Sequence, residues 1–440
     1  MYLRNLKPLV FLLALFPLGI IAQNNSMNLS LQQAIELGIK QNLMRQVSQL
    51  EVEKKQAKVN EYMANLFPTI KASGNYNRNI DRPVIFMPAG PPFFGSVLKM
   101  GSENSYTGGV SFGLPLFNMA IYESIALGKK DLEITKEKLR ENEIQLTTNI
   151  KKTYYNLLLL DESYKVMNKS YKHALDNVQN ITQMNQQGMV SDYDKIRAKV
   201  QVENLKPNLV QLQKSYDNVM RLFKLLLNID DSIQVTIDTT LILDNNIVET
   251  INKEIQFDNN TTLRQLALQK DLLKSQLRLT QSGFYPTLTA IGNYQYQSQA
   301  DNFKFNDYKW VKTSILGLQL NIPIFAGLVV HRQIKQVKIT TKELELQEEF
   351  TRKNIESQIE TAISNMQVAQ EKLSWAQQNM LLAEQGYNIA KTRYNTGQST
   401  LLELNDADNA LTQAQLNHIQ AKFEYLNAKF DLEQLINNNK

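Results

Sequence analysis

Apolar residues recur three or four positions apart over long stretches that contain no proline. These stretches are 116–206, 208–285 and 324–440, and they are rich in Leu, Ile, Ala, Gln, Glu and Lys. The pattern predicts long amphipathic helices. The longest, Ile121 to Met184 and Gly327 to Tyr394, would measure roughly 96 and 102 Å at about 1.5 Å per residue. Helices of this length need partner helices along their whole length, as in coiled coils or helical tubes.

Four short segments instead alternate with a period of two, and they lie at 69–77, 105–116, 287–297 and 312–322. In each, apolar residues form one face and mostly small polar residues form the other, with Ile291 as an exception. This alternation predicts strands of about 9–11 residues, the length of an outer-membrane strand that is apolar towards lipid and polar towards a lumen. Soluble hairpins packed on helices are the alternative interpretation.

The two halves of the chain repeat one another. Three motifs recur: the strand start Leu66–Ile70 in Phe284–Leu288, the strand exit Leu114–Phe117 in Ile322–Phe325, and Gly188 in Gly397. The separations are 218, 208 and 209 residues. Each half therefore reads, in order, helix, strand, loop, strand, very long helix, glycine turn and returning helix. We interpret Pro207, in the first returning helix, as a kink or a helix restart.

These patterns divide the chain into five segments. Arg4 and Lys7 precede the apolar run Leu9–Ile21, which predicts a signal peptide over 1–22. The remaining segments are a first repeat 23–230, a linker 231–257, a second repeat 258–436 and a tail 437–440. We expect strands at 69–79 and 104–117 in the first repeat and at 287–299 and 311–325 in the second, with tip turns near 188 and 397.

Composition excludes several classes of protein. The chain has no cysteine, and its three histidines are far apart, so we expect no metal site and no cofactor. The net charge of +5 is mild for 440 residues and does not indicate a nucleic-acid partner. No nucleophile elbow or paired-carboxylate cleft is evident, so we do not expect an enzyme. No segment after the leader reaches the length of a transmembrane helix.

Four membrane strands leave two open edges, which a bilayer does not tolerate. The strands must therefore be shared between subunits, and a homotrimer is a plausible closure.

The order and doubling of the motifs resemble the TolC-type outer membrane efflux protein family. The resemblance rests on the strand starts and exits, on Arg393-Tyr394-x-x-Gly397, and on Ser30-Leu31-x-x-Ala34 near the start of the first repeat. It implies a mainly helical fold with a membrane β-barrel part: a trimeric, 12-stranded outer-membrane β-barrel that continues into a 12-helix periplasmic α-barrel. It also implies an exit duct of a tripartite efflux system in the outer membrane of a Gram-negative bacterium. Its partners would be outer-membrane lipid, a periplasmic adapter and an inner-membrane pump.

Two other functions stay open at this point. The same duct could serve a type I protein secretion system. A non-channel periplasmic coiled-coil adapter is more remote, because an adapter would have one helical hairpin rather than a doubled unit with four strands.

Candidate site residues lie beside the two glycine turns. Glu403 and Asp406 share a helix face, and a threefold axis would turn them into a ring of carboxylates at a pore constriction. Glu403 could instead only cap its helix, as Asp194 could in the first repeat. The resemblance assigns Asp194 and Tyr394 to contacts that tie the tips together in a closed state. The family has a basic residue where this chain has Ser399, so a salt bridge there is not implied.

Overall fold

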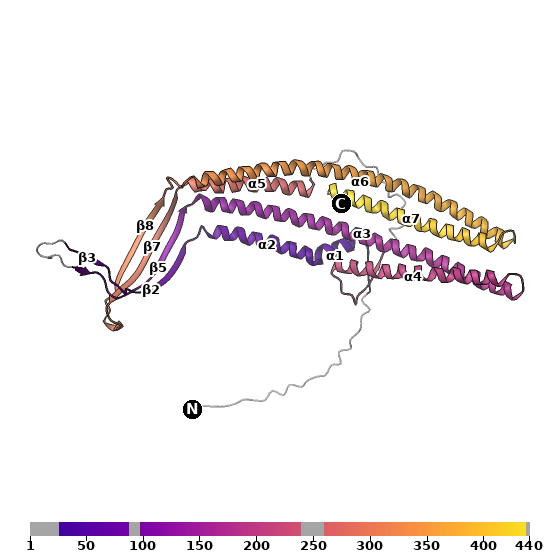
Figure 1. Cartoon of the computed structure of the whole chain (residues 1–440), viewed down its shortest axis with the longest axis horizontal. Coiled ribbons are helices and arrows are strands. Elements are labelled where there is room, and N and C mark those ends of the chain that lie inside the picture. The colour runs from indigo at the N-terminus through magenta and orange to yellow at the C-terminus, as the bar shows by residue number, and fades with distance from the viewer. Residues whose placement is uncertain (1–25, 88–96, 239–258, 437–440) are drawn as a thin grey trace, which may run out of the picture.

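The molecule is elongated, with a β-sheet at one end and long helices running away from it (Figure 1). The computed structural model describes residues 26–87, 97–238 and 259–436. The predicted signal segment 1–22, most of the linker 231–257 and the tail 437–440 lie outside the described residues. Among the described residues, no helix combines the length and the hydropathy needed to span a membrane.

The first repeat starts with short elements and ends in two long helices. Its helices and strands are β1 (Ser26–Leu29), α1 (Leu31–Gln41), α2 (Leu43–Ala64), β2 (Thr69–Arg78), β3 (Val84–Phe86), β4 (Val97–Lys99), β5 (Asn104–Phe117), α3 (Met119–Gln186) and α4 (Asp192–Leu227). The strand β6 (Gln234–Ile237) follows at the start of the linker. Ser30 caps α1 through a capping box with Gln33.

The second repeat has the same order with fewer accessory elements. Its helices and strands are α5 (Thr261–Gln281), β7 (Thr287–Ala300), β8 (Val311–Asn321), α6 (Val329–Asn395) and α7 (Leu401–Ile436), with two single-turn 3₁₀ helices, η3 (Ser282–Phe284) and η4 (Phe305–Asp307). The long helices α3 and α6 contain 68 and 67 residues. The predicted mainly helical fold with a strand part is confirmed.

The four long strands form one antiparallel sheet in the order β2-β5-β7-β8. Its register aligns Ile70 with Phe112, Phe112 with Gly292, and Gly292 with Leu316, so the apolar faces of all four strands coincide. The small polar residues share the other face for the same reason. The sheet therefore has one apolar and one polar side, with β2 and β8 as its open edges.

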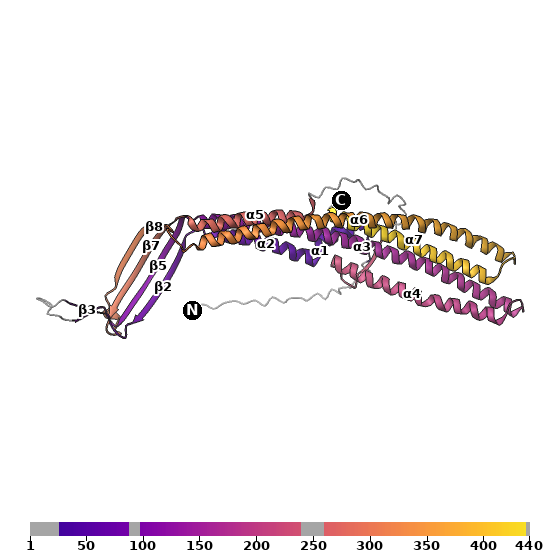
Figure 2. The ribbon, with the colours of Figure 1, turned by 45° about the horizontal axis from the view of Figure 1, so that its top comes forward.

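The helices form a single curved layer that continues the sheet (Figure 2). Near the sheet the neighbours are α2-α3-α5-α6, and towards the far end they are α4-α3-α7-α6. The helix α3 is thus central throughout, whereas α6 lies at one edge of the layer and α2 and α4 lie at the other.

The main core lies where α1, α3 and α4 meet. It contains Ile150, Leu157 and Phe223, and the parallel strands β1 and β6 cover it. The Tyr154 hydroxyl donates to the carbonyl of Asp238 at 2.9 Å, and the carbonyl of Leu29 lies 3.3 Å away. Burial raises the pKa of Tyr154 to about 12, so this phenol stays a donor.

Three expectations differ from the structure. The strand β8 ends at Asn321 rather than at 325, because Pro323 cannot donate to a ladder and a turn with positive φ at Gly327 and Leu328 follows. Pro207 does not restart a helix, since α4 is continuous through it. The loop expected between the first two strands carries the short hairpin β3–β4.

Candidate functional site: the far ends of the helical hairpins

Both helical hairpins turn at the end of the molecule that is far from the sheet (Figure 1), and each turn contains a glycine. Gly188 follows α3 with φ of +73°, and Gly397 follows α6 with φ of +72°. This left-handed conformation costs glycine little, and it ends a helix by satisfying its last carbonyls. The two predicted turns thus place the starts of α4 and α7 at one end of the molecule.

Asp194 holds the start of α4. The Ser191 hydroxyl donates to the Asp194 carboxylate at 2.7 Å, and the Asp194 amide donates back to the Ser191 oxygen at 3.2 Å. The Ser191 amide completes a capping box with the same carboxylate. Asp194 is half-buried and therefore has a structural role at its own helix start.

Glu403 has a similar local role at the start of α7. Its amide donates to the Thr400 hydroxyl oxygen at 3.3 Å, and that hydroxyl lies 3.4 Å from the Glu403 carboxylate. The side chain is nevertheless exposed. A carboxylate in the first turn is also favoured by the helix dipole.

Asp406 differs from both. It is exposed, and within the described part of the chain its carboxylate takes part in no hydrogen bond or ion pair. It shares one exposed stripe of α7 with Glu403, Ala410, Gln413 and Asn417. The structure therefore leaves this acidic pair facing solvent along the same side of α7.

A groove of about 790 Å³ separates the ends of the two hairpins. Asp194 and Arg197 of α4 line it from one side, and Tyr394, Ser399 and Thr400 line it from the other. Burial raises the pKa of Tyr394, so its hydroxyl is a neutral donor at physiological pH. The two residues assigned to tip contacts thus share one groove, which Glu403 and Asp406 do not line.

A polar contact between α3 and α7, farther from the tips than this groove, was not anticipated from the sequence. The Asp408 carboxylate accepts from the Ser170 hydroxyl at 3.1 Å and lies 3.0 Å from His173 Nδ1. The His173 ring stacks on Tyr387 of α6. Asp408 lies two residues after Asp406 and hence on another side of the helix. Polar residues at helical spacing in both partners are the signal that could have found it.

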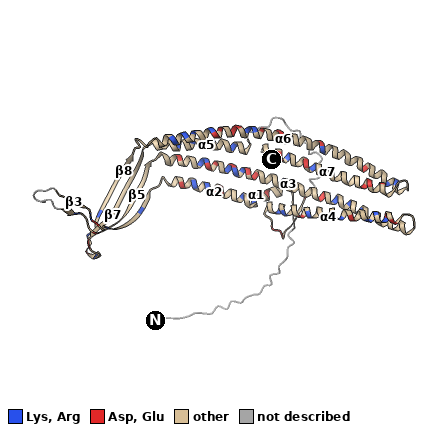
Figure 3. Cartoon of the chain, viewed as in Figure 1, with Lys and Arg blue, Asp and Glu red and all other residues tan. Residues whose placement is uncertain are grey.

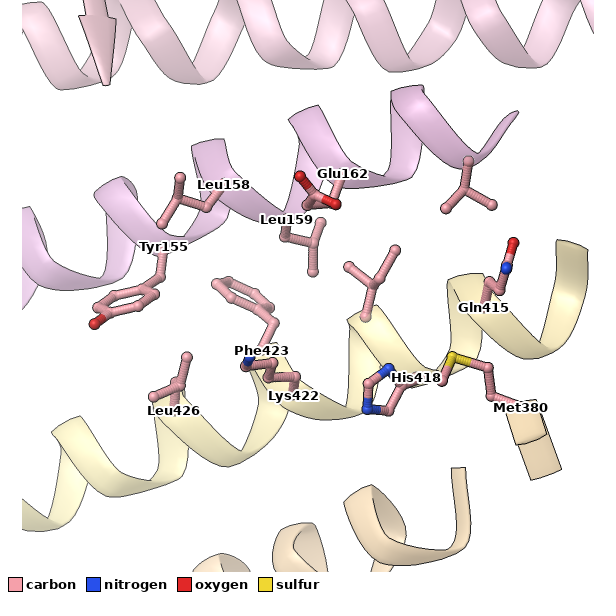
Figure 4. A pocket seen from close by; sticks show the side chains of 12 residues that line it. Tyr155, Leu158, Leu159, Glu162, Met380, Gln415, His418, Lys422, Phe423 and Leu426 are labelled. Atoms are coloured by element: carbon pink, nitrogen blue, oxygen red, sulfur yellow. The ribbon is translucent and has the colours of Figure 1, made fainter. Parts of the chain in front are cut away.

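A second cavity, of about 290 Å³, lies between α3, α6 and α7 (Figure 4). Figure 4 shows Phe423 of α7 in the space between α3 and α7, with Leu159 above it and Met380 to one side. His418 and Lys422 line the cavity from α7. Burial, and then the Lys422 ammonium, hold the pKa of His418 below its ordinary value. Lys422 lies 16 residues after Asp406, or about 160° around the helix, so this cavity opens on the opposite side of α7 from the acidic stripe.

Both edges of the helical layer expose apolar side chains. On α6, Val368, Trp375, Leu382 and Ile389 follow one another at seven-residue intervals and are 51%, 63%, 66% and 62% exposed. On the opposite edge, α4 exposes Tyr193, Ile196, Val200 and Val210. A seven-residue apolar stripe is the pattern of a helix that packs lengthwise on another helix.

No group of three or more His, Asp or Glu side chains that could hold a metal ion occurs in the described ranges. The site is therefore built from exposed carboxylates, capping contacts and the shape of the helical layer.

Comparison with known proteins gives consistent results. The family model described as outer membrane efflux protein matches residues 34–226 and 256–438. The outer membrane protein TolC of Salmonella enteritidis is 20% identical over 332 residues, which is 74% of this chain and 67% of that protein. TolC of Escherichia coli K12 is 19% identical over 336 residues, or 74% of this chain and 68% of that protein.

Among solved structures, the Campylobacter jejuni CmeC outer membrane channel superposes with a TM-score of 0.70 at 17% identity, covering 92% of this chain and 85% of that one. The outer membrane protein VceC of Vibrio cholerae superposes with a TM-score of 0.71 at 15% identity, covering 92% of this chain and 95% of that one.

Proposed function

Because this chain belongs to the outer membrane efflux protein family, we propose that it is the exit duct of a tripartite efflux system. It is an outer-membrane protein built on the TolC-like fold. In this proposal it forms a homotrimer that passively exports small molecules, which an inner-membrane pump and a periplasmic adapter hand over. The polar face of the sheet lines the duct, and the apolar face contacts outer-membrane lipid.

The observation that carries the proposal is the pair of open edges on one continuous layer. Within the described ranges, the strands β2 and β8 end the sheet without partners, and α4 and α6 end the helical layer with exposed apolar stripes. Open strand edges in a bilayer leave backbone groups without hydrogen bonds, at a cost of several kcal/mol each. Joining the β8 and α6 edge of one subunit to the β2 and α4 edge of the next removes both defects.

The internal repeat supports this arrangement. With the 209-residue separation of the tip glycines, Leu159 and Val166 of α3 correspond to Val368 and Trp375 of α6. The first pair faces α7 across the cavity of Figure 4, where Ile419 also lies. Ile419 corresponds to Val210 of α4. Val368 and Trp375 of α6 and Val210 of α4 are thus the counterparts of residues that already face one another within the subunit.

The acidic stripe of α7 supplies the charge of the proposed constriction. In a trimer, Glu403 and Asp406 would place six carboxylates around the narrow end of the duct, where low-dielectric walls and short distances strengthen their field. Asp194 and Tyr394, which share the tip groove, would hold the neighbouring hairpins together in the closed state. Both roles are part of the proposal.

The oligomeric state is the first test. The protein, extracted from membranes in detergent, is expected to be a trimer by light scattering and to show heat-modifiable migration on gels. A monodisperse monomer that is soluble without detergent would contradict the proposal.

The constriction is tested by Glu403→Gln combined with Asp406→Asn. Glutamine keeps the capping geometry at 403, so the double variant removes charge and preserves the fold. In planar bilayers we expect altered single-channel conductance and a clear loss of cation preference. Asp217→Asn, on α4 beside Lys214, serves as the control and should change neither. Unchanged selectivity in the double variant would remove these residues from the constriction.

A further inference from the structure

The four membrane-length strands carry an unbalanced charge. They contain Lys71, Arg78 and Lys312 but no Asp or Glu. Figure 3 shows the contrast with the helices, along which acidic and basic residues are mixed. A charge on a strand therefore has no opposite charge on the same sheet to cancel it.

The register assigns the three cations to different faces. Lys71 pairs with Ser111, which pairs with Asn293, so Lys71 lies in a row of the polar face. Lys312 pairs with Tyr296 and lies on the apolar face. Arg78 belongs to the apolar face as well, at the last position of β2, and its guanidinium lies 4.0 Å from Glu103. Within the four described strands, Lys71 is the single charged residue of the polar face.

Lys71 is exposed and forms no ion pair with any described residue. It is the third residue of β2, at the end of the sheet where the helices begin (Figure 1). Its nearest neighbours on the polar face are Thr69 and Ser73 on the same strand and Ser111 on β5. Hydroxyl groups of this kind do not neutralise an ammonium group.

We propose that Lys71 is a selectivity residue of the duct, which favours anionic over cationic small molecules in the barrel. The proposal rests on the proposed function, because the threefold axis turns one lysine into a ring of three ammonium groups facing the lumen. This ring is opposite in sign to the carboxylates proposed for the tip. The duct then has an acidic periplasmic entrance and a basic barrel base. The basic base attracts organic anions such as carboxylates or phosphates.

The selectivity caused by Lys71 should depend on salt concentration. Three charges that face a water-filled pore change ion occupancy several-fold when the Debye length is about 30 Å, near 0.01 M salt. The same charges are screened within about 3 Å at 1 M salt. A selectivity that depends on Lys71 therefore appears in dilute salt and disappears in concentrated salt.

The experiment compares Lys71→Gln with Lys312→Gln, because the two lysines lie on opposite faces of one sheet. Both variants are made in the Glu403→Gln, Asp406→Asn background, so that the tip does not dominate. Reversal potentials in KCl gradients across planar bilayers give the K⁺/Cl⁻ permeability ratio. We expect Lys71→Gln to raise this ratio about threefold in dilute salt and to leave it unchanged near 1 M. Lys312→Gln should have no effect, and Lys71→Arg should keep the parent ratio.

Several outcomes would overturn the proposal. A conducting Lys71→Gln trimer with the parent ratio in dilute salt would show that Lys71 does not set selectivity. A shift caused by Lys312→Gln instead would show that the apolar face lines the pore. A Lys71→Arg channel that behaves like Lys71→Gln would exclude charge as the cause. Failure of the unaltered protein to form a trimeric channel would instead refute the proposed function itself, which separates the two failures.

Discussion

The helices α3 and α6 are counterparts in the two repeats, yet one is central in the layer and the other lies at its edge. They have nearly equal lengths and end in the same glycine turn. On one side each packs on its returning helix. Ile150 of α3 corresponds to Ile359 of α6, and the two are 0% and 3% exposed. Their partners correspond as well, since Phe223 lies against the first and Leu432 against the second.

The two helices differ in what a further helix adds to this packing. On α3, Met167 and Ala174 are buried, because Leu416 of α7 packs against the cluster that they form with α4. Their counterparts on α6 are Ala376 and Ala383, which are only half-buried, and the exposed apolar stripe of α6 lies beside them. The repeated sequence thus specifies the packing of each long helix on its returning helix. Burial of the remaining apolar residues depends on whether a further helix lies beside them in the layer.

The largest expected effect comes from placing charged residues in the exposed apolar stripe of α6. Trp375→Glu combined with Leu382→Glu should abolish trimer formation, because two carboxylates would be desolvated in a helix–helix interface without partners. Light scattering of the purified protein in detergent measures this. Gln377→Glu adds a charge on the opposite side of the same helix and should leave the trimer intact. A trimer of normal stability in the double variant would mean that α6 is not an interface helix.

The shared packing surface gives the next largest effect. Ile150→Ala and Ile359→Ala should each lower the free energy of local opening by about 2–5 kcal/mol, because each leaves a cavity in a buried cluster. Amide hydrogen exchange of α3 and α6 reports the two values separately. Leu175→Ala, at an exposed site of α3, should change exchange little. Very different costs at the two isoleucines would show that the repeats do not share this core.

A smaller effect is expected at the contact between α3 and α7. Asp408→Ala removes the acceptor for Ser170 and the partner of His173. It should lower the free energy of unfolding by about 1.5–3 kcal/mol, because the carboxylate is a charged hydrogen-bond partner. The two hairpins should then separate more readily, which predicts a higher open probability in single-channel records. Asp217→Ala, which affects only local contacts with Gln213 and Lys214, is the control. Equal open probabilities would assign the contact to folding alone.

The smallest effect concerns pH. His418 has a lowered pKa in the folded protein, because burial and then Lys422 disfavour its charged form, whereas the ordinary value is 6.5. The unfolded chain therefore binds the proton more tightly, and the stabilisation present above pH 6.5 declines as the pH falls below it. Glu162, paired with Lys165, also lines this cavity.

His418→Gln should flatten this part of the stability profile, measured by thermal unfolding between pH 7 and about pH 5. Gln415→Ala changes the same cavity without removing a titrating group and should keep the slope. An identical slope in His418→Gln would exclude His418 as its source.

Local patterns were sufficient to predict most of the architecture. Alternation in 69–77 and 287–297 predicted β2 and β7, and the paired glycines predicted both hairpin turns. These signals are local because backbone periodicity and positive φ depend on neighbouring residues. The predicted end of β8 at 325 was wrong, because side-chain alternation does not report that Pro323 lacks the amide donor that a ladder needs.

The site was less predictable. The spacing of Glu403 and Asp406 predicted that they share a helix face, and their place at a constriction stays a prediction. The contact of Asp408 with His173 joins residues 235 positions apart. The parallel pair β1–β6 was missed for the same reason, since each strand has only four residues. Long-range contacts of short elements depend on the assembled layer, and no local pattern of the sequence contains that information.

The pairing of β1 with β6 has a consequence for the order of folding. Ser26 pairs with Gln234, so the strand at the start of the described chain cannot find its partner until the whole first repeat and the start of the linker have been made. Closing so large a loop is slow, and it becomes favourable only after α3 and α4 have brought its ends together. The Tyr154 hydroxyl, which contacts the carbonyls of Leu29 at the end of β1 and of Asp238 just after β6, then joins the two segments to the middle of α3. The first repeat should therefore complete its core in a late, cooperative step, and refolding kinetics of Tyr154→Phe should show this step slowed or lost.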